Sequence, residues 1–214
     1  MTSKRVVAAV LAVAMLTTTT GCIGFLTGEE ALSFTAEPAV VDESAAESAG
    51  YSTDGPRVLA VNRTVSAAGQ EREVVAENQV TTYRKTLDLG VFEADLGVFT
   101  VVSTPAVEIA GQTLNPIEEF SNRRLVSLVQ DQYEGLNDVQ EVSSQTITVQ
   151  GQQTEVTKYS GTATVQGRVV DVYVHVTKYR DGDDFVVAIG VYPQRLSGEE
   201  ANVLSMMRAI EHPA

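Results

Sequence analysis

Cysteine is nearly absent from this chain of 214 residues, and Cys22 is the single one. One cysteine cannot form an internal disulfide, and a paired-cysteine metal motif is excluded for the same reason. Lysine is also scarce, since only Lys85, Lys158 and Lys178 follow residue 21. The sequence contains neither a glycine-rich phosphate loop nor a G-x-S-x-G elbow. These absences remove the enzyme classes that are easiest to recognise and leave charge, location and fold as the informative features.

Acidic residues outnumber basic ones by 28 to 15, which gives a net charge of −13. The first 21 residues contain two bases and no acid, so the rest of the chain, with 13 bases and 28 acids, carries −15. No basic stripe is present to neutralise phosphates, which argues against nucleic-acid binding. A charge of this size keeps a protein soluble where salt screens self-repulsion, and halophilic proteins use it. We therefore interpret the acidity as a solvated, salt-adapted surface rather than an acidic active site.

The first 22 residues have the layout of a secretory signal. Lys4 and Arg5 precede an apolar run over 6–16, and a threonine-rich stretch then leads to Gly21 and Cys22. Cleavage before Cys22 would leave its thiol at the new N-terminus, where it can take a lipid. The apolar run is shorter than the roughly 20 residues of a membrane span. The sequence thus predicts a signal peptide over 1–21, lipid attachment at Cys22 and a tether over 22–31.

Hydrophobic periodicity over 32–214 predicts an α+β fold, in which an antiparallel β-sheet meander packs against a few helices. A short strand at 32–35 and a short helix over 41–49 come first. Alternating apolar residues then predict a hairpin over 57–85 that turns at 67–70. After a connection over 87–97, a nearly continuous apolar strand at 98–102 is expected near the middle of the sheet. Tight glycine turns join four further strands, over 139–149, 152–165, 168–179 and 185–192.

Two longer helices are predicted from their capping signals. Asn115 is an N-cap with Pro116 at the first helical position, and this helix should end at Gly135. Its apolar stripe comprises Ile117, Phe120, Leu125, Leu128, Val129 and Tyr133. Near the C-terminus, residues 197–200 form a capping box that begins a second helix. The buried face of that helix comprises Val203, Met207 and Ile210.

An internal similarity leaves the domain organisation open between two alternatives. Residues 64–74 and 146–156 share threonine, glycine, glutamine, glutamate and valine at matching positions, and each segment follows a helix. The chain is then either a single domain over 32–214 or two similar halves, over 32–106 and 107–214. Both alternatives predict one antiparallel sheet system with a few helices.

Polar residues on the strand at 168–179 form the candidate ligand site. Asp171, Tyr173 and His175 recur with period two, so they share one face of the strand at steps of about 7 Å. Two nearby ligands do not complete a tetrahedral metal site, and we expect neither a bound metal nor a cofactor. We expect this row to be the solvated face of a half-buried sheet. The alternative is a small-ligand or metal site on the same face.

Three other polar features receive structural interpretations. His212 lies close to the chain end, where fraying is expected. The acidic residues at 181–184 are expected to form a hairpin turn, since the acidic residue that completes an EF-hand loop is missing. Asn62 begins an N-glycosylation sequon and is a candidate modification site on an exported chain.

Several segments distributed along the chain carry a resemblance to a known family. They are Gly21-Cys22, GFLTGEE at 24–30, FTAEP at 34–38, STP at 103–105, NP at 115–116, DVYVHV at 171–176 and GDDFVV at 182–187. With these segments the chain resembles a family of haloarchaeal lipoproteins of unknown function. The resemblance implies an exported, lipid-anchored protein, and the only functional residue that it carries over is Cys22. The order of elements over 115–210 is also similar to the PsbP and Mog1 superfamily, a likeness of topology that does not carry function.

Two positions depart from the lipoprotein pattern. Thr19 stands where a lipobox usually has an aliphatic residue, and Lys4-Arg5 stands where a twin-arginine signal has two arginines. The export route, Sec or twin-arginine, therefore stays open.

These observations predict a non-enzymatic protein held by a lipid on the extracytoplasmic face of the cell membrane. Its expected role is to bind a partner protein or a small ligand. One alternative is a surface or metal-dependent enzyme that uses Asp171, Tyr173 and His175. Another is a carrier of an apolar molecule, which requires an enclosed apolar cavity.

Overall fold

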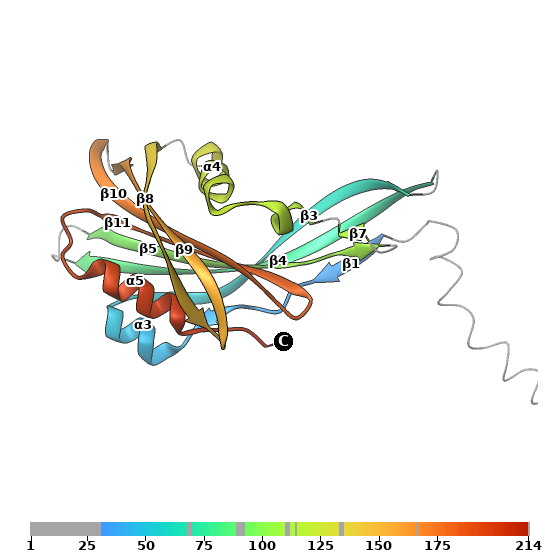
Figure 1. Cartoon of the computed structure of the whole chain (residues 1–214), viewed down its shortest axis with the longest axis horizontal. Helices are drawn as coiled ribbons and strands as arrows, with labels where there is room; N and C mark the ends of the chain where they lie inside the picture. Colours follow the sequence, from blue (N-terminus) through green and yellow to red (C-terminus); the bar gives the residue numbers. More distant parts are fainter. Residues whose placement is uncertain are drawn as a thin grey trace, which may run out of the picture. The chain divides into compact units, whose positions relative to one another are not determined.

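The computed structural model describes residues 31–67, 70–88, 93–109, 112–113, 115–132, 135–165 and 167–213. Within them the chain is mostly β-strand, with a few short helices (Figure 1). The strands are β1 Leu32–Thr35, β2 Val40–Val41, β3 Ser52–Ala67, β4 Gln70–Asp88, β5 Glu93–Pro105, β6 Glu108–Ile109, β7 Gln112–Thr113, β8 Leu136–Val149, β9 Gln152–Val165, β10 Arg168–Asp181, β11 Asp184–Pro193 and β12 Ile210–Glu211. The helical elements are α3 Glu43–Ala49, the 3₁₀ turn η1 Pro116–Glu119, α4 Asn122–Gln132 and α5 Glu199–Arg208.

The chain divides into two compact units. The larger unit comprises Phe34–Val61 and Ala76–Ala214, and it contains all three α-helices of the described residues. The smaller unit includes Asn62–Val75, which is the tip of the β3–β4 hairpin. The sites described below belong to the larger unit.

An eight-stranded sheet organises the described residues. Its strand order is β1-β4-β5-β11-β10-β9-β8, and β3 pairs with β4 outside this path. The pairs from β4–β5 through to β9–β8 are antiparallel, so the predicted four-stranded meander is present. The central position predicted for 98–102 is also confirmed, because β5 lies between β4 and β11. The helical share is smaller than the predicted α+β class implies.

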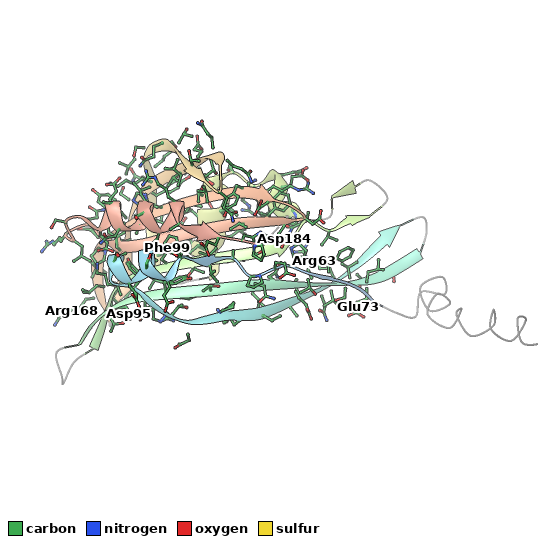
Figure 2. All side chains as sticks on the ribbon, turned by 90° about the horizontal axis from the view of Figure 1, so that it is seen from below. Arg63, Glu73, Asp95, Phe99, Arg168 and Asp184 are labelled. Carbon is green, nitrogen blue, oxygen red and sulfur yellow. The ribbon has the colours of Figure 1, made fainter. Side chains whose placement is uncertain are left out.

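Helices α3 and α5 cover one face of the sheet, where they lie side by side (Figure 1). Val203 and Met207 of α5 are fully buried, as predicted for that helix face, and they share a core with Phe99 of β5, which Figure 2 labels. Ile210, the third residue predicted on that face, is buried too but lies in β12. The close approach of α5 depends on Gly190, because a Cβ atom there would lie 2.6 Å from Val203 Cγ1. Docking of α5 on the sheet therefore requires a residue without a side chain at position 190.

Helix α4 covers part of the opposite face. Leu125 and Val126 are buried and pack with Val172, Val174 and Val187 of the central strands. Strands β10 and β11 are consequently covered on both faces. This explains why residues 184–188 are buried without alternation.

The helix predicted from Asn115 to Gly135 is wrong in its continuity. Asn115 does act as an N-cap, accepting a hydrogen bond from the Ile117 amide, but only for the 3₁₀ turn η1. Phe120 then adopts an extended conformation, and α4 begins after Ser121, whose Oγ accepts from the Arg124 amide. The break is stabilised from the sheet: Lys178 Nζ donates to the carbonyls of residues 117, 118 and 120 at 2.8, 2.7 and 2.9 Å.

The predicted capping box of the C-terminal helix is also wrong. Gly198 is the N-cap, in a left-handed conformation with φ of 84°, and its position offers no side chain for capping. Glu199 and Glu200 are directed instead to lysines of the sheet, as described below.

The predicted connection over 87–97 is largely strand. Strand β4 continues to Asp88 and β5 begins at Glu93, with residues 89–92 outside the described part. A register shift after Lys85, where Lys85 pairs with Gly97 and Thr86 with Asp95, lets the pairing continue past the glycine.

Candidate functional site

The predicted row on β10 is divided between solvent and core. Asp171 is exposed, Tyr173 is half-buried and His175 has no exposed surface. The expectation of a solvated face is therefore wrong at His175, because the sheet position opposite it, Gly190, lies directly under α5. Asp171 and His175 are four residues apart, roughly 13 Å along the strand, so a single metal ion cannot bind both. Among the described residues, no group of three His, Cys, Asp or Glu side chains is arranged to hold a metal.

His175 is held by Tyr192 of β11. Its Nε2 lies 3.0 Å from Tyr192 Oη, and the two rings stack with centroids 5.7 Å apart. Burial lowers the pKa of His175 to about 4, while Glu200 opposes the decrease and Lys158 adds to it. His175 is therefore neutral at neutral pH. Its Nδ1 has no hydrogen-bond partner among the described residues.

Two lysines tie the first turn of α5 to the sheet. Lys158 Nζ lies 2.7 Å from Glu200 Oε2 and 3.9 Å above the centre of the Tyr173 ring. Lys85 Nζ lies 2.7 Å from Glu199 Oε2, and Glu199 is buried. Tyr173 thus contacts a lysine that is paired with α5, and His175 lies beneath the same helix, whereas Asp171 is exposed.

A second polar cluster gathers around His212, which is 6% exposed. Its Nδ1 lies 3.1 Å from Asp181 Oδ2, and its Nε2 lies 3.1 Å from Asp184 Oδ2 and 3.2 Å from Ser103 Oγ. We call these four residues the His212 cluster. The expectation that His212 frays is wrong, because β12 pairs with β2 and the Gln150 side chain donates to the His212 carbonyl at 3.1 Å.

The expectation of a simple turn at 181–184 is incomplete for the same reason. The turn is there, but Asp184 also accepts from the Glu37 amide at 2.9 Å. The His212 cluster therefore joins β5, the β10–β11 turn, the segment after β1 and the C-terminal residues. Nothing in the local sequence pattern signals this, since the partners of His212 are 28, 31 and 109 positions away.

The His212 cluster contains the residue types of a Ser-His-Asp triad but not its geometry. In a triad one imidazole nitrogen faces the serine hydroxyl while the other nitrogen donates to the carboxylate. Here both nitrogens of His212 lie 3.1 Å from carboxylate oxygens, and Nε2 is shared between Asp184 and Ser103. Ser103 also has no exposed surface. The cluster holds the C-terminal residues against β5 and the β10–β11 turn.

Strand β3 exposes hydrophobic side chains. It pairs with β4 on one side only within the described sheet, so its second edge is open. Val58, Leu59 and Val61 are 59%, 49% and 38% exposed. Gly55, with φ of 93°, and Pro56 precede this stretch, and both are typical of an edge strand. Three large exposed hydrophobic residues within four positions form the apolar edge of β3.

An open groove of about 620 Å³ lies next to the apolar edge. It is lined by residues 52–55 and Arg57 of β3, and by Val80, Thr82, Arg84 and Thr86 of β4. We call it the β3–β4 groove. Arg84 Nε approaches Asp95 Oδ2 only to 3.9 Å, and both side chains are about half exposed, so this ion pair contributes little. Arg57 is exposed and has no hydrogen bond or ion pair among the described residues.

The remaining predicted site residues have simpler outcomes. Cys22, with the predicted signal and most of the tether, lies outside the described residues, so lipid attachment stays a prediction. Asn62 is exposed on β3, in the smaller unit. Its glycosylation stays a prediction as well. No helix in the described part of the chain has the length and hydrophobicity needed to cross a membrane.

Residues 38–211 match the family described as "Domain of unknown function (DUF6517)". The chain belongs to this family. The DUF6517 match extends from just before β2 to the end of β12, so it includes α3, α4, α5, the apolar edge of β3 and all of the His212 cluster except His212 itself. No curated protein matches the chain. Among solved structures, the solution structure of cyanobacterial PsbP (CyanoP) from Synechocystis sp. PCC 6803 is weakly similar, with a TM-score of 0.42 and 13% sequence identity. The similarity covers 84% of this chain and 94% of that one.

Proposed function

We propose that this member of the DUF6517 family is a non-enzymatic, lipid-anchored protein of the extracytoplasmic membrane face that docks a partner protein along the open edge of β3. The observation that carries the proposal is the apolar edge of β3, where Val58, Leu59 and Val61 remain exposed on a strand paired on one side. Exposed hydrophobic residues that cluster on a surface mark interaction sites more often than scattered ones do.

Strand addition is the docking mode that this edge favours. An extended segment of the partner would form main-chain hydrogen bonds to the open edge, while its side chains would contact Leu59 and Val61 on one face of β3 and Val58 on the other. Complete burial of a large aliphatic side chain contributes about 2 kcal/mol, and these side chains are already partly covered. The three together would contribute roughly 3 kcal/mol, which is enough to discriminate between partners when added to backbone pairing.

The proposal of a non-enzymatic role rests on the two histidines. His175 is buried and neutral against Tyr192, and His212 is held between two carboxylates. Neither is placed to move a proton to or from a substrate. A carrier function has less support, because fully buried side chains such as Met206 and Met207 fill the region between the sheet and α5.

The proposed location rests on the sequence. The charged start, the short apolar run and the Gly21-Cys22 pair support export and lipid attachment, and the net charge of −13 supports a salt-rich exterior. Mass spectrometry of membrane-extracted wild type and Cys22→Ser tests this part. We expect the wild type to lack residues 1–21 and to carry a lipid mass at Cys22. Wild-type protein that retains these residues with an unmodified Cys22 would refute it.

Photo-crosslinking in intact cells tests the docking edge. A photoreactive amino acid is placed at Leu59 in one strain and at Val142 of β8 in another. Val142 is a matched control, because it is 52% exposed on the strand at the other end of the sheet. We expect a discrete crosslinked product from Leu59 that is missing from Val142. Equal products at both positions, or none at Leu59, would contradict docking on β3.

A further inference from the structure

We infer that the β3–β4 groove binds carboxylate side chains, so that the partner segment added to β3 is acidic. This inference rests on the proposed docking edge and specifies the chemistry of its partner. It begins from the geometry of β4, on which Val80, Thr82, Arg84 and Thr86 alternate and therefore share one face. The opposite face carries Tyr83, which is buried in the core with α3 and α5. The groove is thus separate from the buried polar network under α5.

Two arginines give the groove its charged donors. Arg57 and Arg84 line it and carry positive guanidinium groups that pair with carboxylates in bidentate fashion. Thr82 also lines it, but its Oγ1 lies 3.5 Å from Thr100 Oγ1 and is already engaged. An apolar ligand would cover the guanidinium groups without offering them acceptors, which carries an energetic cost. A carboxylate supplies those acceptors.

The two arginines are available because the fold does not use them. The lysines of the described chain bind Glu199, Glu200 or the carbonyls at 117–120, so their charges are already paired. Arg57 makes no such contact, and Arg84 is 54% exposed with a single loose approach to Asp95. In a chain with a net charge of −13, Arg57 is thus a cation without an acidic partner among the described residues, and Arg84 is only loosely paired.

Acidic groups near the groove set a condition on the ligand. Asp54 also lines the groove, and Asp95 lies near Arg84. A bound carboxylate must compete with Asp54 and Asp95 for the two guanidinium groups. This requires direct contact with those groups rather than long-range attraction. Added salt screens exposed charges over distances of about 10 Å at 0.1 M, so affinity should fall as salt rises.

A peptide fits this site better than an anionic polysaccharide. Arg57 directly precedes Val58 and Leu59, so the charged groove continues into a strand edge with free main-chain groups. Only an extended polypeptide can pair with that edge and place side chains at alternate positions against it. Because Arg57, Leu59 and Val61 share one face of β3, the geometry favours a partner segment that presents acidic and apolar residues on the same face.

Fluorescence anisotropy with two synthetic peptides tests this inference on the exported part of the chain in its complete length. One labelled peptide repeats two valines followed by two glutamates, so that each face of the extended chain carries both residue types, and the other has glutamine in place of glutamate. We expect the glutamate peptide to bind roughly tenfold more tightly, as one charge-assisted hydrogen-bonding pair allows. Arg57→Gln and Arg84→Gln should each remove most of this preference. Arg208→Gln, which changes an exposed arginine on α5, is the control and should leave it unchanged.

The outcomes separate this inference from the proposed function. Equal binding of both peptides, with both lost in Leu59→Asp, would refute the acidic partner while supporting docking on β3. Absence of binding by either peptide, or binding unaffected by Arg57→Gln and Arg84→Gln, would also overturn the inference. The proposed function would then be judged by the crosslinking at Leu59 alone. Binding of alginate, a carboxylated polysaccharide, in place of the glutamate peptide would overturn the assignment to a peptide.

Discussion

Acidification should destabilise this protein through His175. Burial lowers the pKa of His175 from 6.5 to about 4 in the folded state, whereas an unfolded chain exposes the imidazole to water. Between these values the unfolded state binds a proton that the folded state does not, so stability falls as pH decreases from 6.5 to about 4. The difference of roughly 2.5 pKa units corresponds to about 3 kcal/mol. This is a substantial part of the 5–15 kcal/mol that stabilises a typical domain.

Urea unfolding at constant salt measures the effect, at pH values from about 7 to about 4. Far-ultraviolet circular dichroism is the suitable signal, since the chain has no tryptophan. His175→Gln retains a hydrogen-bonding group toward Tyr192 but cannot titrate. Carboxylates that protonate in this range contribute to both proteins, so the difference between their curves isolates His175. We expect the wild type to lose about 3 kcal/mol more than His175→Gln. Parallel curves would refute the assignment of this acid sensitivity to His175.

Three further predictions concern single residues. His212→Gln should lower the free energy of unfolding by about 2 kcal/mol, because a glutamine side chain cannot place polar atoms at both ring-nitrogen positions that face Asp181 and Asp184. Chemical denaturation measures this, and an unchanged value would contradict the cluster's role. Gly190→Ala should cost about 1–3 kcal/mol through overlap with Val203, and a paired Val203→Ala should recover part of the loss in the same assay. Lys178→Met should cost about 1–3 kcal/mol by removing the ammonium group that donates to three carbonyls. Amide exchange should then increase selectively over 117–120, and a uniform increase would argue against the role of Lys178 in the break of the helix.

The sequence predicts the parts of this fold that depend on neighbouring residues. Glycine turns and alternating valines specify the strands of the meander, and the apolar face of α5 follows from its helical period. The errors arise where a distant residue competes with a local signal. Asn115 is an N-cap as expected, but only of the 3₁₀ turn η1, because Lys178, some 60 positions away, binds the carbonyls that a continuous helix would use. Local propensity cannot anticipate that competition.

For the candidate site too, local sequence patterns predict correctly and contacts with distant residues are not anticipated. The alternation on β10 correctly places Asp171, Tyr173 and His175 on one face, but it cannot show that α5 covers part of that face. The sequence does not reveal the His212 cluster, because its members come from three separate segments and form no motif. The apolar edge of β3 is visible in the sequence only as an ordinary strand. Its exposure follows from its place at the margin of the sheet.

The placement of the lysines makes the folded state hard to modify with amine-directed reagents. Lys85 and Lys158 have side chains only 24% and 13% exposed, and each is paired with a glutamate of α5. Lys178 uses its ammonium group on three carbonyls. An acylating reagent should therefore react slowly with these amines until the segment that each one holds has detached. The rate of labelling at Lys85 and Lys158 then reports the release of α5, and the rate at Lys178 reports the opening of the segment before α4. Because lysine is scarce in this sequence, these few amines report separately on two parts of one fold.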